Sequence, residues 1–314
     1  MRTPKELIES LRAQGRSQLD ALRHDGVMWR RFAYKGTAES PEWFRRYSPP
    51  YWGTGVYLAL PRTRRAVVHN QALLLGLSPD SLAAQVAAQR VFAEFAHCLT
   101  DALEMSGKPG RPFEREYVDS RHFFEAIAKK RGVILVTAHT GSWEVGGRLL
   151  KLHRDIRTTM VMAEEVNQGS RGFVDELRKK SGVDVLYASG NDPSTAITLL
   201  SRLRNNEVIA IQIDRPPASA KVITTRLAGA PWRVPEGPFR LAQASGAPVI
   251  PVFLRRSGYR RYTFTLAEPI EIARRATPDE LQAAAQRATD ALERFVRTYP
   301  DQWFHFSPIG LPEA

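Results

Sequence analysis

Hydrophobic positions recur at helical spacing through the first third of the chain and as short continuous runs through the rest. The helical spacing predicts an amphipathic helix over residues 5–23 and further helices over 63–77, 80–105 and 115–130. Short β-branched runs predict strands over 133–138, 158–163, 183–187, 208–213 and 249–254, with helices between the first four. Two more strands are expected over 222–227 and 262–266, and a closing helix over 279–298. This order indicates an α/β fold with a mixed, mostly parallel sheet flanked by helices, and a helical N-terminal portion.

A histidine and a glutamate stand where the first of these strands gives way to a helix. His139 follows the apolar run, and the segment from Ser142 has the features of a helix start. The carboxyl edge of a sheet is where open α/β folds bind ligands. Gly141 lets the chain turn so that Glu144, in the first turn of the helix, meets His139. Such a pair is a general base with its orienting carboxylate, although a partly buried histidine without chemistry fits the local pattern too.

Residues 29–52 are unusually rich in aromatic side chains interleaved with arginines. The arginines in the stretch include Arg30, Arg31, Arg45 and Arg46. Aromatic rings next to cations suit a membrane interface, where rings lie at head-group level and cations meet anionic lipid. A locally packed aromatic cluster between helices is the alternative interpretation of the same stretch.

The composition limits the classes of protein that the chain can belong to. With 43% hydrophobic residues it can bury a substantial core, yet no apolar run is long enough for a membrane span. The start of the chain lacks the pattern of a secretory signal, so a cytoplasmic protein is expected. The single cysteine, Cys98, excludes an internal disulfide framework and cysteine-type zinc clusters. No histidine pair has zinc-ligand spacing and no glycine-rich phosphate loop is present, so no metal or cofactor is implied.

The net charge of +12 favours polyanionic partners: nucleic acid, anionic lipid head groups or an acidic carrier protein. The basic residues are spread along the chain and form no recognisable nucleic-acid module, so lipid or carrier protein is favoured and no nucleic acid is expected. A basic, non-catalytic protein that binds lipid or nucleic acid remains the alternative to an enzyme.

An ordered series of motifs carries a resemblance to a known family. The series comprises His139 with Glu144, Arg178 in 175–182, Gln212 to Arg215, 229–231, 237–242, 246–252 and 299–304. Taken together, these motifs resemble the late (lauroyl/myristoyl) acyltransferases of lipid A biosynthesis, within the lysophospholipid acyltransferase group, over about 64–308. The resemblance implies a glycerolipid acyltransferase-like fold. It also implies transfer of a fatty acyl group from an acyl carrier protein or CoA thioester to a hydroxyl of a glycolipid or lysolipid.

The same resemblance assigns roles to individual residues. His139 and Glu144 fall on the catalytic histidine and acid, and Arg178 and Asp214 fall on a second charged pair of the active site. Arg178, Arg215 or backbone N–H groups near Gly141 are candidates to face a phosphate or the developing oxyanion. The sequence departs from the family at Arg215-Pro216-Pro217 and lacks the family's hydrophobic anchoring helix.

Two functional regions follow from these patterns. Residues 1–60 are expected to form an amphipathic and aromatic segment that docks on an anionic membrane, in place of the anchor. Residues 61–314 are expected to form the acyltransferase catalytic domain. The expected location is therefore the cytoplasm, peripherally associated with the inner membrane.

Overall fold

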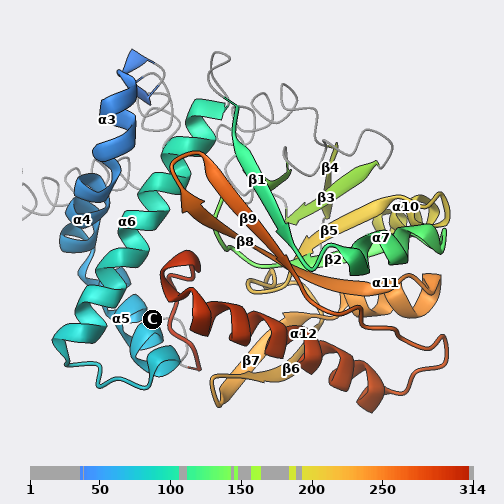
Figure 1. Cartoon of the computed structure of the whole chain (residues 1–314). Helices are drawn as coiled ribbons and strands as arrows, with labels where there is room; N and C mark the ends of the chain where they lie inside the picture. The colour runs from blue at the N-terminus through green and yellow to red at the C-terminus, as the bar shows by residue number, and fades with distance from the viewer. Residues whose placement is uncertain are drawn as a thin grey trace, which may run out of the picture.

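A seven-stranded sheet forms the centre of the structure. The structure is a computed structural model, and it describes residues 36–37, 39–105, 112–142, 145–147, 157–163, 184–188 and 193–310. The strand order is β1-β9-β8-β2-β5-β3-β4. The N-terminal helices stand along one side of this sheet, and the long helix α12 runs past its strands near the C-terminus (Figure 1). This arrangement confirms the mixed α/β class expected from the sequence.

The N-terminal part is helical; the hydrophobic spacing predicts the last two of its described helices, whereas the first two were not anticipated. Its helices are α3 (Glu42–Tyr47), α4 (Pro49–Ala59), α5 (Pro61–Leu75) and α6 (Leu82–Met105). Helices α4 and α6 pack very closely at Gly53, where an added Cβ would lie 2.4 Å from the carbonyl oxygen of Phe92. Only glycine fits this contact, which joins α4 to the helix that borders the sheet. In the described part of the chain, no helix combines the length and apolar character needed to cross a membrane.

The sheet is parallel except where β8 meets β9. Its strands are β1 (Glu114–Val118), β2 (Val133–Thr137), β3 (Thr158–Ala163), β4 (Asp184–Ala188), β5 (Val208–Gln212), β8 (Val249–Gly258) and β9 (Arg261–Leu266). β2 lies between β5 and β8 and is parallel to both, whereas β8 and β9 form an antiparallel pair. A separate antiparallel hairpin is made by β6 (Val222–Leu227) and β7 (Ala230–Pro235). The residues that end β2 and β5 therefore meet at one edge of the sheet.

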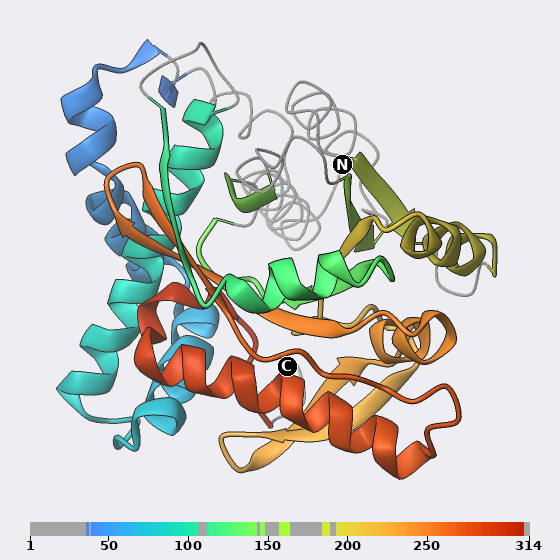
Figure 2. The same ribbon diagram turned by 45° about the vertical axis from the view of Figure 1, so that its right-hand side comes forward.

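Alternate residues of the central strands face two separate cores. Ile134 and Val136 of β2 lie in one cluster with side chains from α10 (Pro193–Arg204), α11 (Gly237–Ser245) and α12 (Pro278–Thr298). Val133 and Leu135 lie in the other, with side chains from α5, α6 and α7 (Arg121–Ala128). Burial on both faces explains the continuous apolar run of β2, because each side chain of the strand has a core to enter. Figure 2 shows α7 and α12 on different sides of the strands.

The structure corrects one expected helix. The helix predicted over 115–130 is shorter, and its first residues belong to β1, which pairs in parallel with β9 at the edge of the sheet. The ring of Tyr117 stacks on Phe264 of that neighbouring strand with centroids 5.0 Å apart. Only every second residue of β1 is partly buried, a strand pattern that five residues show too briefly to outweigh the helical spacing beyond them. Strand β7 was not anticipated either, and the helix expected over 5–23 lies outside the described residues.

Candidate active site at the carboxyl edge of the sheet

His139 and Asp214 meet because of the register of two neighbouring strands. Thr137 at the end of β2 pairs with Gln212 at the end of β5. His139 and Asp214 each lie two residues beyond that pair. Parallel strands in this register carry the two side chains to the same edge of the sheet, where open α/β folds place their ligand sites. The position of His139 agrees with the strand-end position that the sequence predicts.

The Asp214 carboxylate accepts three hydrogen bonds. Nδ1 of His139 lies 2.8 Å from Oδ1, and the backbone N–H of His139 donates to Oδ2 at 3.0 Å. The indole Nε1–H of Trp303 also donates to Oδ2, at 2.9 Å. The Asp214 side chain is fully buried, so its charge depends on these donors for solvation. The carboxylate therefore fixes both the ring and the backbone of His139.

The surroundings of Asp214 keep its carboxyl group ionised. Burial alone raises the pKa of this group. The charge and hydrogen bonds of His139 outweigh that effect and, with Arg215, hold the pKa of Asp214 well below its usual range. An ionised carboxylate only accepts hydrogen bonds, so the proton between the two groups belongs to Nδ1 of His139. In the neutral imidazole, Nε2 then carries the lone pair.

The free face of His139 can receive a substrate proton. Its side chain is 25% exposed, and no described residue makes a hydrogen bond to Nε2. A neutral imidazole with Nδ1–H held by a carboxylate and Nε2 accessible is the arrangement that a general base requires. The geometry of the described residues thus supports proton abstraction from a substrate bound at this edge.

The loop that carries His139 is fixed by the segment after α12. The backbone N–H of Phe304 donates to the carbonyl of His139 at 2.8 Å, and the N–H of Gly141 donates to the carbonyl of Gln302 at 2.8 Å. Gly141 has φ +54, and a Cβ at this position would lie 2.7 Å from the carbonyl oxygen of Leu254. Glycine is therefore required by conformation and by space.

These bonds remove two backbone candidates for oxyanion binding. The N–H of Gly141 is used by Gln302, and the N–H of Thr140 donates to the carbonyl of Ala138 at 2.7 Å. Neither N–H group can bind an oxyanion unless the loop rearranges. Backbone N–H groups near Gly141 are one of three candidates that the sequence offers for this role, and the N–H groups of Thr140 and Gly141 are both engaged in main-chain hydrogen bonds.

The other site residues expected from the sequence are placed only in part. Arg215 is exposed and donates from its guanidinium to the carbonyl of Phe304, which brings its charge near Asp214. Glu144 and Arg178 lie outside the described residues, so the roles that the sequence indicates for them stay predictions. Among the described residues, no group of three or more His, Cys, Asp or Glu side chains is placed to hold a metal ion.

An aromatic cluster behind Asp214 was not anticipated. The ring of Trp303 stacks on His305 with centroids 4.9 Å apart, and Trp232 packs edge-on against both. Trp303 and His305 are buried beside the Asp214 carboxylate, and burial lowers the pKa of His305 to about 4. The motif at 299–304 contributes to the resemblance, but nothing in the sequence indicates that its tryptophan holds Asp214. A separate hollow of about 760 Å³ lies beside α12, and neither His139 nor Asp214 lines it.

Two phosphatidylinositol mannoside acyltransferases are similar to this chain in sequence. The phosphatidylinositol mannoside acyltransferase of Mycobacterium tuberculosis is 26% identical over 206 residues, which cover 66% of this chain and 63% of that protein. The enzyme of the same name from Mycolicibacterium smegmatis is 25% identical over 195 residues, which cover 62% of this chain and 61% of that protein. The chain thus spans less than two thirds of the length of these relatives.

Two further comparisons concern a solved structure and a family. The 1-acyl-sn-glycerophosphate acyltransferase of Thermotoga maritima is 13% identical, with a TM-score of 0.36, over 76% of this chain and 95% of that chain. The family described as bacterial lipid A biosynthesis acyltransferase matches residues 55–308. Because this match takes in most of the chain together with His139, Asp214 and Trp303, the chain belongs to the bacterial lipid A biosynthesis acyltransferase family.

Proposed function

We propose that this protein is an O-acyltransferase that moves a fatty acyl group from an acyl carrier protein or CoA thioester to a hydroxyl of a glycolipid or lysolipid. The observation that carries the proposal is the His139 imidazole, held at Nδ1 by Asp214 and open at Nε2, at the carboxyl edge of the sheet. Membership of an acyltransferase family supports the reaction class.

The proposed reaction needs one proton carrier. Nε2 of His139 takes the proton of the acceptor hydroxyl as its oxygen attacks the thioester carbonyl. Asp214 stabilises the imidazolium that forms, because its negative charge lies 2.8 Å from Nδ1. The tetrahedral intermediate then expels the thiolate, which takes the proton back from His139. A thioester is already activated, so no covalent intermediate on the enzyme and no cofactor are part of the proposal.

Two acidic residues have a place in this scheme. Asp214 takes the orienting role on Nδ1. Glu144, five residues after His139, is proposed as the acidic member of a His-x4-Glu pair. The family resemblance indicates this pair. Arg178 and Arg215 are proposed to face the anionic part of a substrate, because guanidinium groups bind phosphate in a bidentate manner.

The acceptor class is proposed from the relatives. The two mycobacterial proteins are named for acyl transfer to phosphatidylinositol mannoside, a mannosylated glycolipid. The acceptor proposed for this chain is therefore a lipid with a free hydroxyl and an anionic phosphate head group. The basic charge of the chain suits such an acceptor and a phosphorylated or acidic donor.

We further propose that residues 1–60 dock the catalytic domain, 61–314, on an anionic membrane surface. Four aromatic side chains of α3 and α4 are largely exposed: Trp43 (65%), Tyr47 (58%), Tyr51 (80%) and Trp52 (63%). Amphipathic aromatic rings favour the head-group region of a bilayer. Arg45 does not belong to this surface, because its guanidinium lies 3.2 Å from the buried carboxylate of Glu104.

The experiment that tests the proposed reaction measures acyl transfer from acyl carrier protein and CoA thioesters to lysophospholipid and phosphatidylinositol mannoside acceptors. His139→Ala should lower the rate by about 10²-fold or more, the lower range for loss of a general base. The matched control is His122→Ala, which removes a histidine of α7 outside the site. Transfer by folded His139→Ala at the rate of the control would overturn the proposal. Binding without transfer by the unmodified protein would instead favour a non-catalytic lipid-binding protein.

A further inference from the structure

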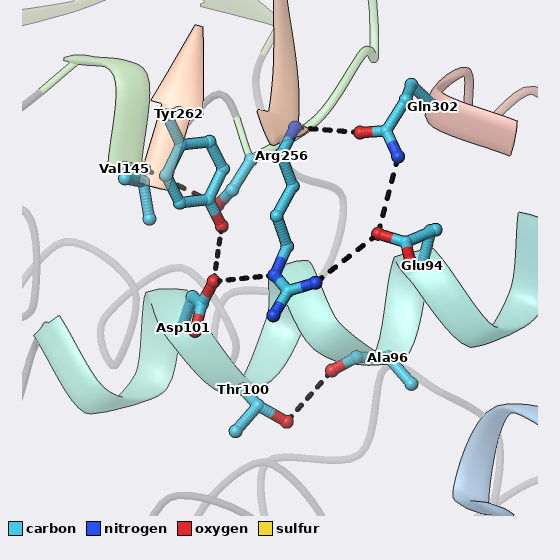
Figure 3. A network of polar contacts seen from close by, with 9 residues as sticks. Glu94, Ala96, Thr100, Asp101, Val145, Arg256, Tyr262 and Gln302 are labelled. Carbon is cyan, nitrogen blue, oxygen red and sulfur yellow. Dashed lines mark hydrogen bonds and ion pairs between the residues drawn. The ribbon is translucent and has the colours of Figure 1, made fainter. Parts of the chain in front are cut away.

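A buried polar network joins α6 to the strands beside the active site (Figure 3). The Arg256 guanidinium on β8 lies between two acidic side chains of α6, with Nε 3.2 Å from Asp101 and Nη1 3.6 Å from Glu94. The hydroxyl of Tyr262 on β9 donates to the same carboxylate oxygen of Asp101 at 2.7 Å. The network therefore fixes α6 to the β8–β9 pair through the buried charges of Arg256 and Asp101 and the partly exposed carboxylate of Glu94.

Gln302 is the member of this network that also contacts the active-site loop. Its side-chain Oε1 accepts from the backbone N–H of Arg256 at 2.8 Å, and its Nε2 donates to Glu94 at 3.3 Å. Its main-chain carbonyl accepts from Gly141 N–H at 2.8 Å. Gln302 is buried and lies in the single turn η1 (Pro300–Gln302), directly before the residue that donates to Asp214. One residue thus links α6, β8 and the loop that carries His139.

The shortness of η1 makes this side chain important. A turn of three residues makes few hydrogen bonds of its own, so its position depends on what holds it from outside. Both polar ends of the Gln302 amide are engaged, and the segment that follows supplies the N–H of Phe304 to the His139 carbonyl and the indole of Trp303 to Asp214. A shift of this turn would move the donors to His139 and Asp214 together.

We propose that Gln302 is a positioning residue, which sets the geometry of the His139–Asp214 pair by holding the main chain that supports both. Glu94 of α6 is its anchor. This inference rests on the proposed function insofar as it concerns the rate, but the hydrogen bond of His139 to Asp214 reports the positioning without any substrate. The helical N-terminal portion is in this view a part of the catalytic apparatus.

The experiment compares three variants with the unmodified protein. Gln302→Leu keeps the approximate length of the side chain and removes both amide contacts. Tyr262→Phe is the matched control, because it removes a buried hydrogen bond of the same network on the side away from His139. The third variant exchanges the partners, Glu94→Gln with Gln302→Glu, so that one amide and one carboxylate still face each other.

Three kinds of measurement are made on each variant: the unfolding temperature, the kinetic constants kcat and KM for acyl transfer, and the NMR signal of the Nδ1–H proton of His139 in [15N]histidine-labelled protein. The signal is identified by its loss in His139→Ala. Gln302→Leu should weaken that signal and lower kcat by about 10²-fold with little change in KM, because small displacements of catalytic groups have effects of this size. Tyr262→Phe should unfold at a lower temperature and keep both the signal and kcat. The exchanged pair should retain the signal and most of kcat.

The outcomes separate this inference from the proposed function. If Gln302→Leu keeps the signal and kcat of the control, or if the exchanged pair behaves no better than Gln302→Leu, Gln302 has no positioning role. If Gln302→Leu does not fold, the single variant Gln302→Glu takes its place, because it sets two carboxylates against each other. The inference then requires that Gln302→Glu has a weaker NMR signal and a lower kcat than the exchanged pair. A signal that responds as expected in a protein without acyltransferase activity would uphold the positioning and reject the proposed reaction.

Discussion

Nδ1 of His139 lies 2.8 Å from Oδ1 of Asp214, although 75 residues separate the two in the chain. The pair depends on the in-register parallel pairing of β2 with β5, since each side chain follows its strand by the same number of residues. A shift of either strand by one residue would turn one of the two side chains to the other face of the sheet. The proposed catalytic pair can therefore form only when β2 and β5 pair in this register.

Asp214→Asn should leave the fold intact and lower kcat by about 10²-fold or more, because the amide no longer stabilises the imidazolium and permits the wrong tautomer of His139. The control is Asp184→Asn, which neutralises an exposed carboxylate on the edge strand β4. Steady-state kinetics of the two variants check this expectation. Equal rates for both would mean that Asp214 has only a structural role.

Trp303→Phe should lower kcat by about tenfold, because the Asp214 carboxylate loses its indole donor and hydrogen bonds to charged groups contribute about 1.5–3 kcal/mol. Trp232→Phe is the matched control. The indole nitrogen of Trp232 is buried without a hydrogen-bond partner, so this change removes no such bond while altering the same aromatic cluster. The prediction fails if both tryptophan variants lose activity to the same extent.

Arg178 and Asp214 are predicted from the family resemblance to act as a charged pair. Removing one partner of a buried pair typically costs about 3–5 kcal/mol, because the other charge is left without compensation. Arg178→Ala and Asp214→Ala should each reduce activity or stability, and the double variant should lose clearly less than the sum. A double-mutant cycle on kcat and on the unfolding free energy measures this. Simple addition of the two effects would mean that Asp214 relies on His139 and Trp303 without Arg178.

Much of the fold follows from the sequence because its signals are local. The apolar run that forms β2 and the capping box of α12, in which Thr277 and Glu280 exchange hydrogen bonds, are features of neighbouring residues. Strand β1 is different, because its five residues become a strand only through pairing with β9, more than a hundred positions away. Local periodicity cannot report such a partner.

Local sequence signals locate only one part of the candidate site. The position of His139 at a strand end follows from the residues around it. Its contact with Asp214 needs the order and register of the strands, and the contacts of Trp303 and Gln302 need the turn after α12 to fold back on the loop. These are tertiary relationships, and the motif at 299–304 signals only that this segment matters.

The stability of the protein should fall as the pH falls below about 6.5, in part because of His305. Burial lowers the pKa of His305 to about 4 from an ordinary value of 6.5, so the unfolded state takes up a proton that the folded state excludes. The loss of stability begins near pH 6.5, is complete near pH 4 and amounts to roughly 3 kcal/mol.

The variant His305→Phe isolates this contribution, because it keeps a ring next to Trp303 and cannot titrate. Burial also raises the pKa of Asp101 to about 6 and lowers the pKa of His97 to about 4, but both groups titrate in either protein and their effects cancel in the difference. Urea unfolding at pH 7, 6, 5 and 4 should show the unmodified protein losing stability relative to the variant as the pH falls. A constant difference would contradict the origin in His305.

The exposed rings of α3 and α4 should bring the protein onto anionic vesicles. Trp43→Ala with Trp52→Ala should weaken binding by roughly tenfold or more, since burying a large apolar side chain is worth about 2 kcal/mol. The folded state should be unaffected, because both side chains are more than 60% exposed.

Ile197→Ala is the control, an equally exposed apolar residue on α10. Vesicle flotation with anionic and with zwitterionic lipid measures the effect. Arg45 is left unchanged, because neutralising it would remove one of the two arginines, Arg45 and Arg260, that pair with Glu104 and would confuse loss of binding with loss of stability. If the tryptophan variant floats as well as Ile197→Ala, these rings serve another purpose and the docking role of residues 1–60 is not supported.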